Sequence, residues 1–206
     1  MAINDALLVE GNNDKHVFFA LLKHHQIPQS FKVVDKEGID NLLGTLATEL
    51  KSSDRQHLGI VIDANSNLAA RWAALRNILL DAGAGGVPLT PASEGSVVKV
   101  QQPDRTLTVG IWLMPDNQLP GMLENFVAFL VPQNDTLWDH AGDALKQLPE
   151  FRFTEAHRPK AHIHTWLAWQ EEPGTPLGLA ITKRYLDANA PHVHALLTWI
   201  RRVFSY

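Results

Sequence analysis

The stretch LLVEGNNDKHVFFALL, residues 7–22, decides the fold class of this chain. It predicts a short buried strand at Ala6–Val9, then a turn, then a helix over Asp14–His25 whose apolar residues recur at helical spacing. Two acids, Glu10 and Asp14, lie at the mouth of the strand. A strand that runs directly into a helix is the first half of a crossover unit, which is typical of an α/β fold.

The same alternation continues along the chain. Further strands are predicted at 31–34 and Leu58–Ile62, each followed by a helical pattern, at Ile39–Leu50 and Leu68–Leu80. Strands connected by helices predict a mostly parallel, Rossmann-like sheet flanked by helices.

The second half of the chain has a different pattern. Ser96–Gln102 and Thr106–Leu113 predict a hairpin, or a hairpin that leads into a last core strand. After them, helices are predicted at Met122–Leu130, Thr136–Leu148, Ala161–Gln170, Leu177–Ala188 and His192–Phe204. We therefore expect an α/β core over residues 1–130 and a helical C-terminal extension over 131–206, packed together as one compact domain.

Composition narrows the class of protein. The 206 residues include no cysteine, which excludes disulfides and thiolate metal sites and fits a cytoplasmic protein. The start MAINDALLVE lacks the basic segment of a signal peptide, and no apolar run could span a membrane. The formal net charge is -4, of which residues 151–206 carry +3 and the remainder -7. This asymmetry suits a metal site beside an anion-binding surface, or arises by chance from solvated faces.

Acidic residues follow three of the predicted strands: Glu10, Asp63 and, after Pro115, Asp116. In parallel α/β sheets, ligands bind beyond the carboxyl ends of the strands. Carboxylates that converge there repel one another unless a cation joins them, and an oxygen-only cluster suits Mg²⁺ or Mn²⁺. The pattern predicts a divalent-metal site at this edge.

The motifs LLVEGNND and IVIDAN resemble the Toprim domain of topoisomerases, primases and related nucleases. The segments GIWLMPDNQLPGMLENF and RPKAHIHTWLAWQEEPGTPLG resemble a small uncharacterised bacterial family with a Toprim-like core, which is related to the overcoming-lysogenization-defect nucleases. The likeness covers roughly residues 5–185, and the ordered set of motifs is more specific than any one of them.

The resemblance implies roles for individual residues. Glu10 matches the first-strand glutamate, a metal ligand or general base, and Asp63 matches the first acid of an Asp-x-Asp motif. Asn65 stands at the second position of that motif and offers a carbonyl oxygen without charge, which puts two-metal chemistry in doubt. The other matching positions are Asp14, Asp116 and Glu124 as further metal ligands, and Lys160, just ahead of a helix, as a phosphate-binding catalytic residue.

The leading functional hypothesis is a Mg²⁺- or Mn²⁺-dependent phosphodiester enzyme, a nuclease acting on DNA or RNA. A second hypothesis is a non-catalytic metal- or nucleic-acid-binding module, an adaptor or regulator that works with a partner ATPase, since the related nucleases pair Toprim with an ATPase. A third is phosphotransfer on a small nucleotide. The apolar helix Leu196–Phe204 could form a homodimer, although such a stripe more often packs within its own chain.

The same residues also have alternative interpretations in which their role is structural. Asp14 could be a helix N-terminal charge that interacts favourably with the dipole. Asp63, Asn65 and Ser66 could form a turn and cap before the next helix. The pair His162 and His164 suggests zinc, but residues two apart point to different sides of a helix, so the pair predicts no joint site.

Overall fold

The computed structural model describes residues 4–205. Residues 1–3 and 206, which belong to the ends of the two expected regions and to the segment considered for a signal peptide, lie outside the described residues. The strands are β1 (Ala6–Val9), β2 (Lys32–Asp35), β3 (His57–Asp63), β4 (Ala84–Gly85), β5 (Ser96–Gln101) and β6 (Thr106–Met114). They form one six-stranded sheet in the order β2-β1-β3-β6-β5-β4, in which β2, β1, β3 and β6 are parallel and β5 and β4 are antiparallel to their neighbours. The predicted α/β class and mostly parallel sheet are confirmed.

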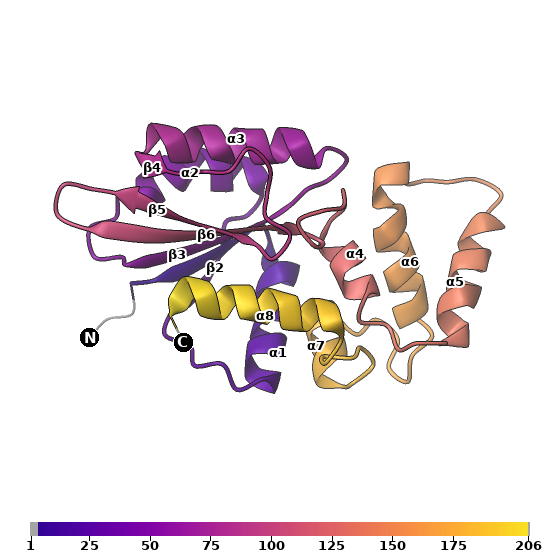
Figure 1. Cartoon of the computed structure of the whole chain (residues 1–206). Coiled ribbons are helices and arrows are strands. Elements are labelled where there is room, and N and C mark those ends of the chain that lie inside the picture. The colour runs from indigo at the N-terminus through magenta and orange to yellow at the C-terminus, as the bar shows by residue number, and fades with distance from the viewer. Residues whose placement is uncertain (1–3, 206) are drawn as a thin grey trace.

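Helices cover both faces of the sheet (Figure 1). They are α1 (Asn12–His24), α2 (Ile39–Leu50), α3 (Leu68–Asp81), α4 (Leu123–Ala128), α5 (Thr136–Lys146), α6 (Arg158–Leu167), α7 (Leu177–Thr182) and α8 (Pro191–Phe204), with a short 3₁₀ turn at Glu155–His157. Helices α2 and α3 lie on one face and α1 and α8 on the other, whereas α4, α5 and α6 gather beyond one end of the sheet (Figure 1). Within residues 4–205, no helix is long and apolar enough to cross a membrane.

Alternation along the strands divides the core in two. Successive side chains of a strand point to opposite faces, so Leu8 packs with α2 and α3 while Leu7 and Val9 pack with α1 and α8. The cluster that contains Leu7 and Val9 also includes buried residues of α4, α5, α6 and α7. It therefore joins residues of the expected core (1–130) to residues of the expected C-terminal extension (131–206). The apolar face of α8 is buried against its own chain, as such a stripe more often is.

A pair of glycines lets α8 approach the sheet closely. Gly59 on β3 and Gly110 on β6 are paired in the parallel register and both lie under α8. A Cβ atom on Gly110 would overlap Val203 and lie 3.1 Å from Trp199 Cζ2. Residues with side chains at these two positions would therefore force the helix away from the strands.

We expect Gly110→Ala to lower the free energy of unfolding by about 1–3 kcal/mol, because the added methyl group overpacks a filled core. Gly44→Ala is the matched control, since Gly44 is exposed in the interior of α2 and its Cβ would meet no atom within 4 Å. That change should raise stability by roughly 0.5–1 kcal/mol, because alanine favours helix more than glycine does. Urea unfolding of both variants checks this, and equal effects would contradict close packing of α8 at Gly110.

The predicted elements differ from the observed ones mainly at their ends. Helix α6 begins at Arg158, three residues before the predicted start, because Pro159 is well accommodated in a first helical turn. Lys160 therefore lies within the helix, and the expectation that it lies ahead of it is wrong. Helix α7 ends at Thr182, well before Ala188, and Arg184 has a φ of 63°, which no α-helix continues through. The two-residue strand β4 was not predicted.

Candidate active site

The site is built at the carboxyl edge of the two central strands. Glu10 directly follows β1 and Asp63 is the last residue of β3. The strands are parallel neighbours, so their ends meet at one edge. Glu10 Oε1 accepts a hydrogen bond of 2.6 Å from the Asp63 backbone N–H, which fixes one carboxylate beside the other.

Two helices add further carboxylates at the same edge. Asp14 lies in the first turn of α1 and Glu124 in the first turn of α4, and both are buried, with 7% and 4% of their surface exposed. Asp63 Oδ1 accepts a hydrogen bond of 2.9 Å from the Leu123 N–H, which ties the start of α4 to the end of β3. Four carboxylates from four elements thus converge.

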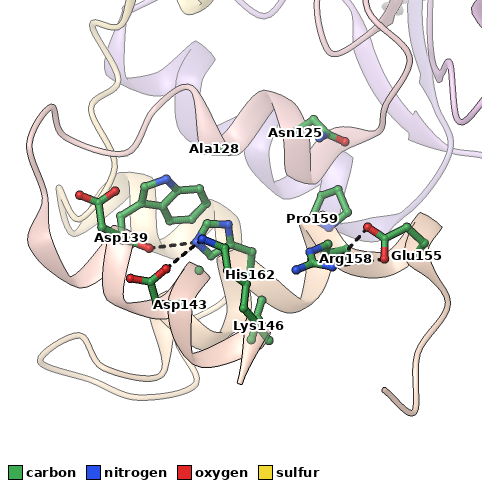
Figure 2. Close-up of a pocket in the computed structure, with 12 residues that line it drawn as sticks. Asn125, Ala128, Asp139, Asp143, Lys146, Glu155, Arg158, Pro159 and His162 are labelled. Atoms are coloured by element: carbon green, nitrogen blue, oxygen red, sulfur yellow. Dashed lines mark hydrogen bonds and ion pairs between the residues drawn. The ribbon is translucent and has the colours of Figure 1, made fainter. Parts of the chain in front are cut away.

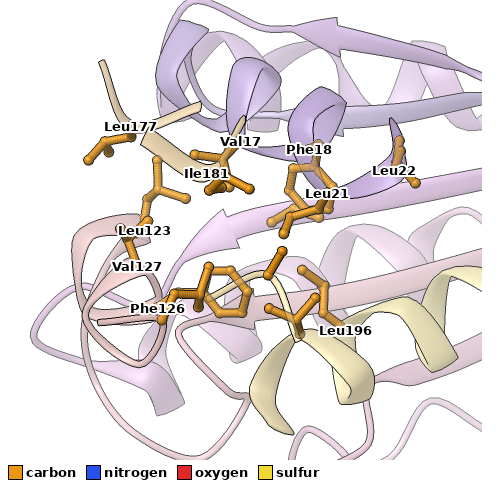
Figure 3. Close-up of a cluster of buried hydrophobic side chains, with 14 of the residues drawn as sticks. Val17, Phe18, Leu21, Leu22, Leu123, Phe126, Val127, Leu177, Ile181 and Leu196 are labelled. Carbon is orange, nitrogen blue, oxygen red and sulfur yellow. The ribbon is translucent and has the colours of Figure 1, made fainter. Parts of the chain in front are cut away.

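Helix α4 is held at this edge by packing and by a backbone bridge. Its Leu123, Phe126 and Val127 pack against side chains of α1 and α7 (Figure 3). The Asn65 N–H donates a hydrogen bond of 2.7 Å to the Gly121 carbonyl, which connects the end of β3 to the loop before α4. The position of Glu124 therefore depends on contacts that are distant in sequence.

A cavity of about 480 Å³ lies over these acids. Its lining includes the polar side chains of Glu10, Asp14, Asp63, Asn65, Glu124, His157 and Lys160. The remaining lining residues are Gly11, Asn12, Asn13, Gly38, Met122 and Leu123. Lys160, on α6, places Nζ 3.3 Å from Glu124 Oε1, and half of its side chain is exposed. The cavity is thus acidic at its base and carries a cation at its rim.

Burial and mutual repulsion raise the pKa values of the carboxyl groups in this cluster. Burial, together with the charges of Glu10, Asp14 and Glu124, raises the pKa of Asp63 to about 8, against the opposing effect of the Leu123 N–H. Burial and the charges of Glu10 and Glu124 raise the pKa of Asp14 to about 7. The pKa of Glu10 is also raised by burial, although the Asp63 N–H and the charge of Arg71 oppose this shift.

The donor set suits a hard divalent cation. Carboxylate and amide oxygens are the ligands of Mg²⁺ and Mn²⁺, and a bound cation would relieve the repulsion that raises these pKa values. Within residues 4–205, no group of three or more histidine, aspartate or glutamate side chains is placed so that it could hold a metal ion alone. Because Mg²⁺ commonly takes one or two carboxylates, with water and substrate phosphate as the other ligands, this arrangement fits an ion that binds together with its substrate.

The structure does not bring Asp116 to the cavity. Its Oδ1 accepts hydrogen bonds from the backbone N–H groups of Gln118 and Leu119, at 3.0 and 2.8 Å, and it is absent from the residues that line the cavity. The cap before α3 is Asn67, whose side chain accepts from the Ala70 N–H at 2.9 Å. The alternative reading of Asp63 and Asn65 as that cap is therefore wrong.

Three neighbours of the acids were not predicted from the sequence. His157 immediately precedes α6 and lines the cavity, and Gly38 lines it from the turn after β2. Arg71, on α3, is the cation whose charge acts on Glu10. The spacing of His157 and Lys160, three residues apart, is a helical signal that could have indicated the first of these.

The two histidines of the predicted pair, His162 and His164, have different surroundings. His162 Nε2 lies 3.0 Å from the Trp138 carbonyl, and its ring stacks on the Trp138 indole at 3.6 Å. His164 is exposed on another side of α6. His25 contacts the Ala188 carbonyl, at 2.8 Å. Both His162 and His164 lie on α6, where residues two apart point about 200° apart.

Comparison with known proteins identifies the family of the chain. A family model described as "Protein of unknown function (DUF3226)" matches residues 4–205, so the chain belongs to that family. Neither a curated protein nor a solved structure matches it.

Proposed function

We propose that this member of the DUF3226 family is a Mg²⁺- or Mn²⁺-dependent phosphodiester enzyme, a nuclease acting on DNA or RNA. The observation that carries the proposal is the convergence of Glu10, Asp14, Asp63 and Glu124 around one cavity, with Lys160 at its rim. The position of the cavity, beyond the carboxyl ends of parallel strands, is where ligands bind in open α/β sheets. The resemblance of the strand-end motifs to Toprim nucleases agrees with this chemistry.

The chain's own residues would orient the reactants. Hydrogen bonds to backbone N–H groups hold one oxygen of Glu10 and one of Asp63, which leaves the other oxygen of each available to a cation. A divalent cation held there supplies a Lewis acid for the phosphoryl group and lowers the pKa of a bound water. Lys160 would neutralise charge that develops on the phosphate while water attacks phosphorus and a P–O bond breaks.

A second candidate function is a metal- or nucleic-acid-binding adaptor without cleavage, which would work with a partner ATPase. One observation favours it. Asn65 lines the cavity where the resemblance implies a second acid, so the site carries one negative charge fewer.

The test is cleavage of supercoiled plasmid, single-stranded DNA and structured RNA, and hydrolysis of free nucleotides, by the purified protein in Mg²⁺, Mn²⁺ or chelator. We expect metal-dependent cleavage of at least one polymer, because the acids and Lys160 together suit a phosphodiester. Calorimetry with Mn²⁺ runs in parallel on the wild type and on Asp63→Asn.

The outcomes separate the candidates. Cleavage that requires metal supports the nuclease. Binding of Mn²⁺ that Asp63→Asn removes, without cleavage of any polymer, supports the adaptor and overturns the nuclease. Hydrolysis of free nucleotides but of no polymer assigns the site to phosphotransfer on a small substrate. Absence of both cleavage and Mn²⁺ binding overturns the metal site itself.

A further inference from the structure

A second cavity, of about 670 Å³, opens between α4, α5 and α6 (Figure 2). The two cavities share no lining residue, but they are lined by residues adjacent in sequence on the same helices. Glu124 and Lys160 face the acids, whereas their neighbours Asn125 and Pro159 line the second cavity. Consecutive side chains point about 100° apart on a helix, so the two cavities lie against different sides of the same helices α4 and α6.

Two aromatic rings, those of Trp138 and His162, form one wall of the second cavity. The rings of Trp138 and His162 stack with centroids 3.6 Å apart, and Trp138 contacts Trp166 edge to face at 6.1 Å. A Cβ atom on Gly142 would lie 3.2 Å from His162 Nε2, so a glycine at this position leaves room for the imidazole. A further planar ring can pack against such a pair in an offset-stacked or edge-to-face arrangement.

Polar groups surround the wall. Asn125 Oδ1 accepts a hydrogen bond of 3.0 Å from the Met122 N–H, so its NH₂ group is what this side chain can offer to a ligand. The charged side chains that line the cavity are Asp139, Asp143, Lys146, Glu155 and Arg158 (Figure 2). Donors and acceptors around an aromatic wall are the chemistry that recognises the edge of a nucleobase.

The two cations in this cavity can exchange their partners. Lys146 pairs with Asp143 at 2.9 Å and Arg158 with Glu155 at 3.3 Å, each three residues apart on the chain. Lys146, Asp143 and Glu155 are more than half exposed, and exposed ion pairs of this kind contribute about 0–1 kcal/mol. A phosphate could therefore displace either carboxylate at little cost, since arginine binds phosphate in a bidentate way.

We propose that this cavity binds a nucleotide of a single-stranded nucleic acid next to the phosphodiester held over the acids, an inference that rests on the nuclease function proposed above. The base would lie along the Trp138–His162 wall, and Arg158 would contact the adjoining phosphate. A base can enter a cavity only when it is unstacked and unpaired, so the site selects single strands over duplexes.

The test compares Arg158→Ala with Arg152→Ala. Arg152 belongs to a similar exposed ion pair, with Glu150, on the same segment but does not line the cavity. Cleavage of a single-stranded oligonucleotide is measured against hydrolysis of bis(p-nitrophenyl) phosphate, a diester without a base. We expect the ratio of kcat/KM for the two substrates to fall about tenfold in Arg158→Ala and to stay at the wild-type value in Arg152→Ala. Lys146→Ala, on the opposite side of the cavity, should lower the ratio in the same direction.

A binding measurement keeps this inference separate from the proposed function. Fluorescence anisotropy of a labelled single-stranded oligonucleotide is followed in Ca²⁺, which also takes oxygen ligands. If binding weakens about tenfold in Arg158→Ala, the nucleotide site is supported. If the wild type also cleaves no substrate in any metal, the proposed nuclease function is overturned while the nucleotide site stands. Equal affinity and an equal substrate ratio in Arg158→Ala and Arg152→Ala overturn the site even if the protein cleaves. Absence of binding by the wild type overturns it as well.

Discussion

Asp63→Asn is expected to abolish metal-dependent cleavage and, at the same time, to make the protein more stable. The amide keeps an oxygen that can accept from the Leu123 N–H but loses the negative charge that a divalent cation requires. We expect kcat/KM to fall about 100- to 1000-fold, the range found when one preorganised electrostatic group is removed from an active site.

The stability gain follows from the same buried charge. Burial and three neighbouring carboxylates raise the pKa of Asp63 to about 8, so its ionised form is unfavourable in the folded protein. Each pKa unit corresponds to about 1.4 kcal/mol, and the neutral amide escapes a large part of this penalty at pH 8. We expect the melting temperature to rise by about 5 °C or more at pH 8 in chelator, measured by circular dichroism.

Asp116→Asn is the matched control. Asp116 also follows a strand at this edge, but its carboxylate accepts hydrogen bonds within its own turn and does not line the cavity. It should retain cleavage within about a factor of two and should not become more stable, because Asp116 is only partly buried and its carboxylate has turn N–H partners that an amide oxygen can keep. Equal loss of activity in both variants, or retained activity in Asp63→Asn, would show that Asp63 is not part of the catalytic site.

The second large effect is a fall in stability with rising pH when no divalent cation is present. Asp14 and Asp63 have pKa values of about 7 and about 8 in the folded protein, against an ordinary value of 3.8 for an aspartate. Between pH 5 and 8 the folded state therefore holds protons that the unfolded chain has released. Stability decreases with pH wherever the folded state binds more protons, and each group contributes up to about 1.4 kcal/mol per pH unit.

Urea unfolding in chelator at pH 5, 6, 7 and 8 measures this slope. The double variant Asp14→Asn/Asp63→Asn should remove most of it, and Mn²⁺ should restore stability to the wild type at pH 8 but not to the variant. Asp5 makes stability depend on pH in the opposite direction, because hydrogen bonds from His57 and Gln56 lower its pKa in the folded protein. This effect operates only below pH 3.8, the pKa of Asp5 in the unfolded chain, and so lies outside the measured range. Stability that is flat or rises between pH 5 and 8 would show that the two buried aspartates ionise normally.

The sequence alone determined the elements and the edge at which the acids meet. Helical and strand periodicity are local properties, so Ala6–Val9 and Ile39–Leu50 were predicted with the bounds that the structure shows. Once the strands are known to be parallel, their carboxyl ends lie at the same edge, and the pairing of β1 with β3 then brings Glu10 to Asp63. Helix ends were less predictable, because α6 and α7 begin or end through turn geometry and packing.

Only the tertiary structure decided which later acids reach the cavity. Asp116 and Glu124 both follow β6, but the bridge between Asn65 and Gly121 and the packing of α4 on α1 and α7 bring Glu124 back over the end of β3. The raised pKa values depend on the same long-range packing, since a carboxylate is desolvated only when distant elements cover it. The second cavity likewise exists only where α4, α5 and α6 meet, because its wall and its cations come from separate helices that no local pattern relates.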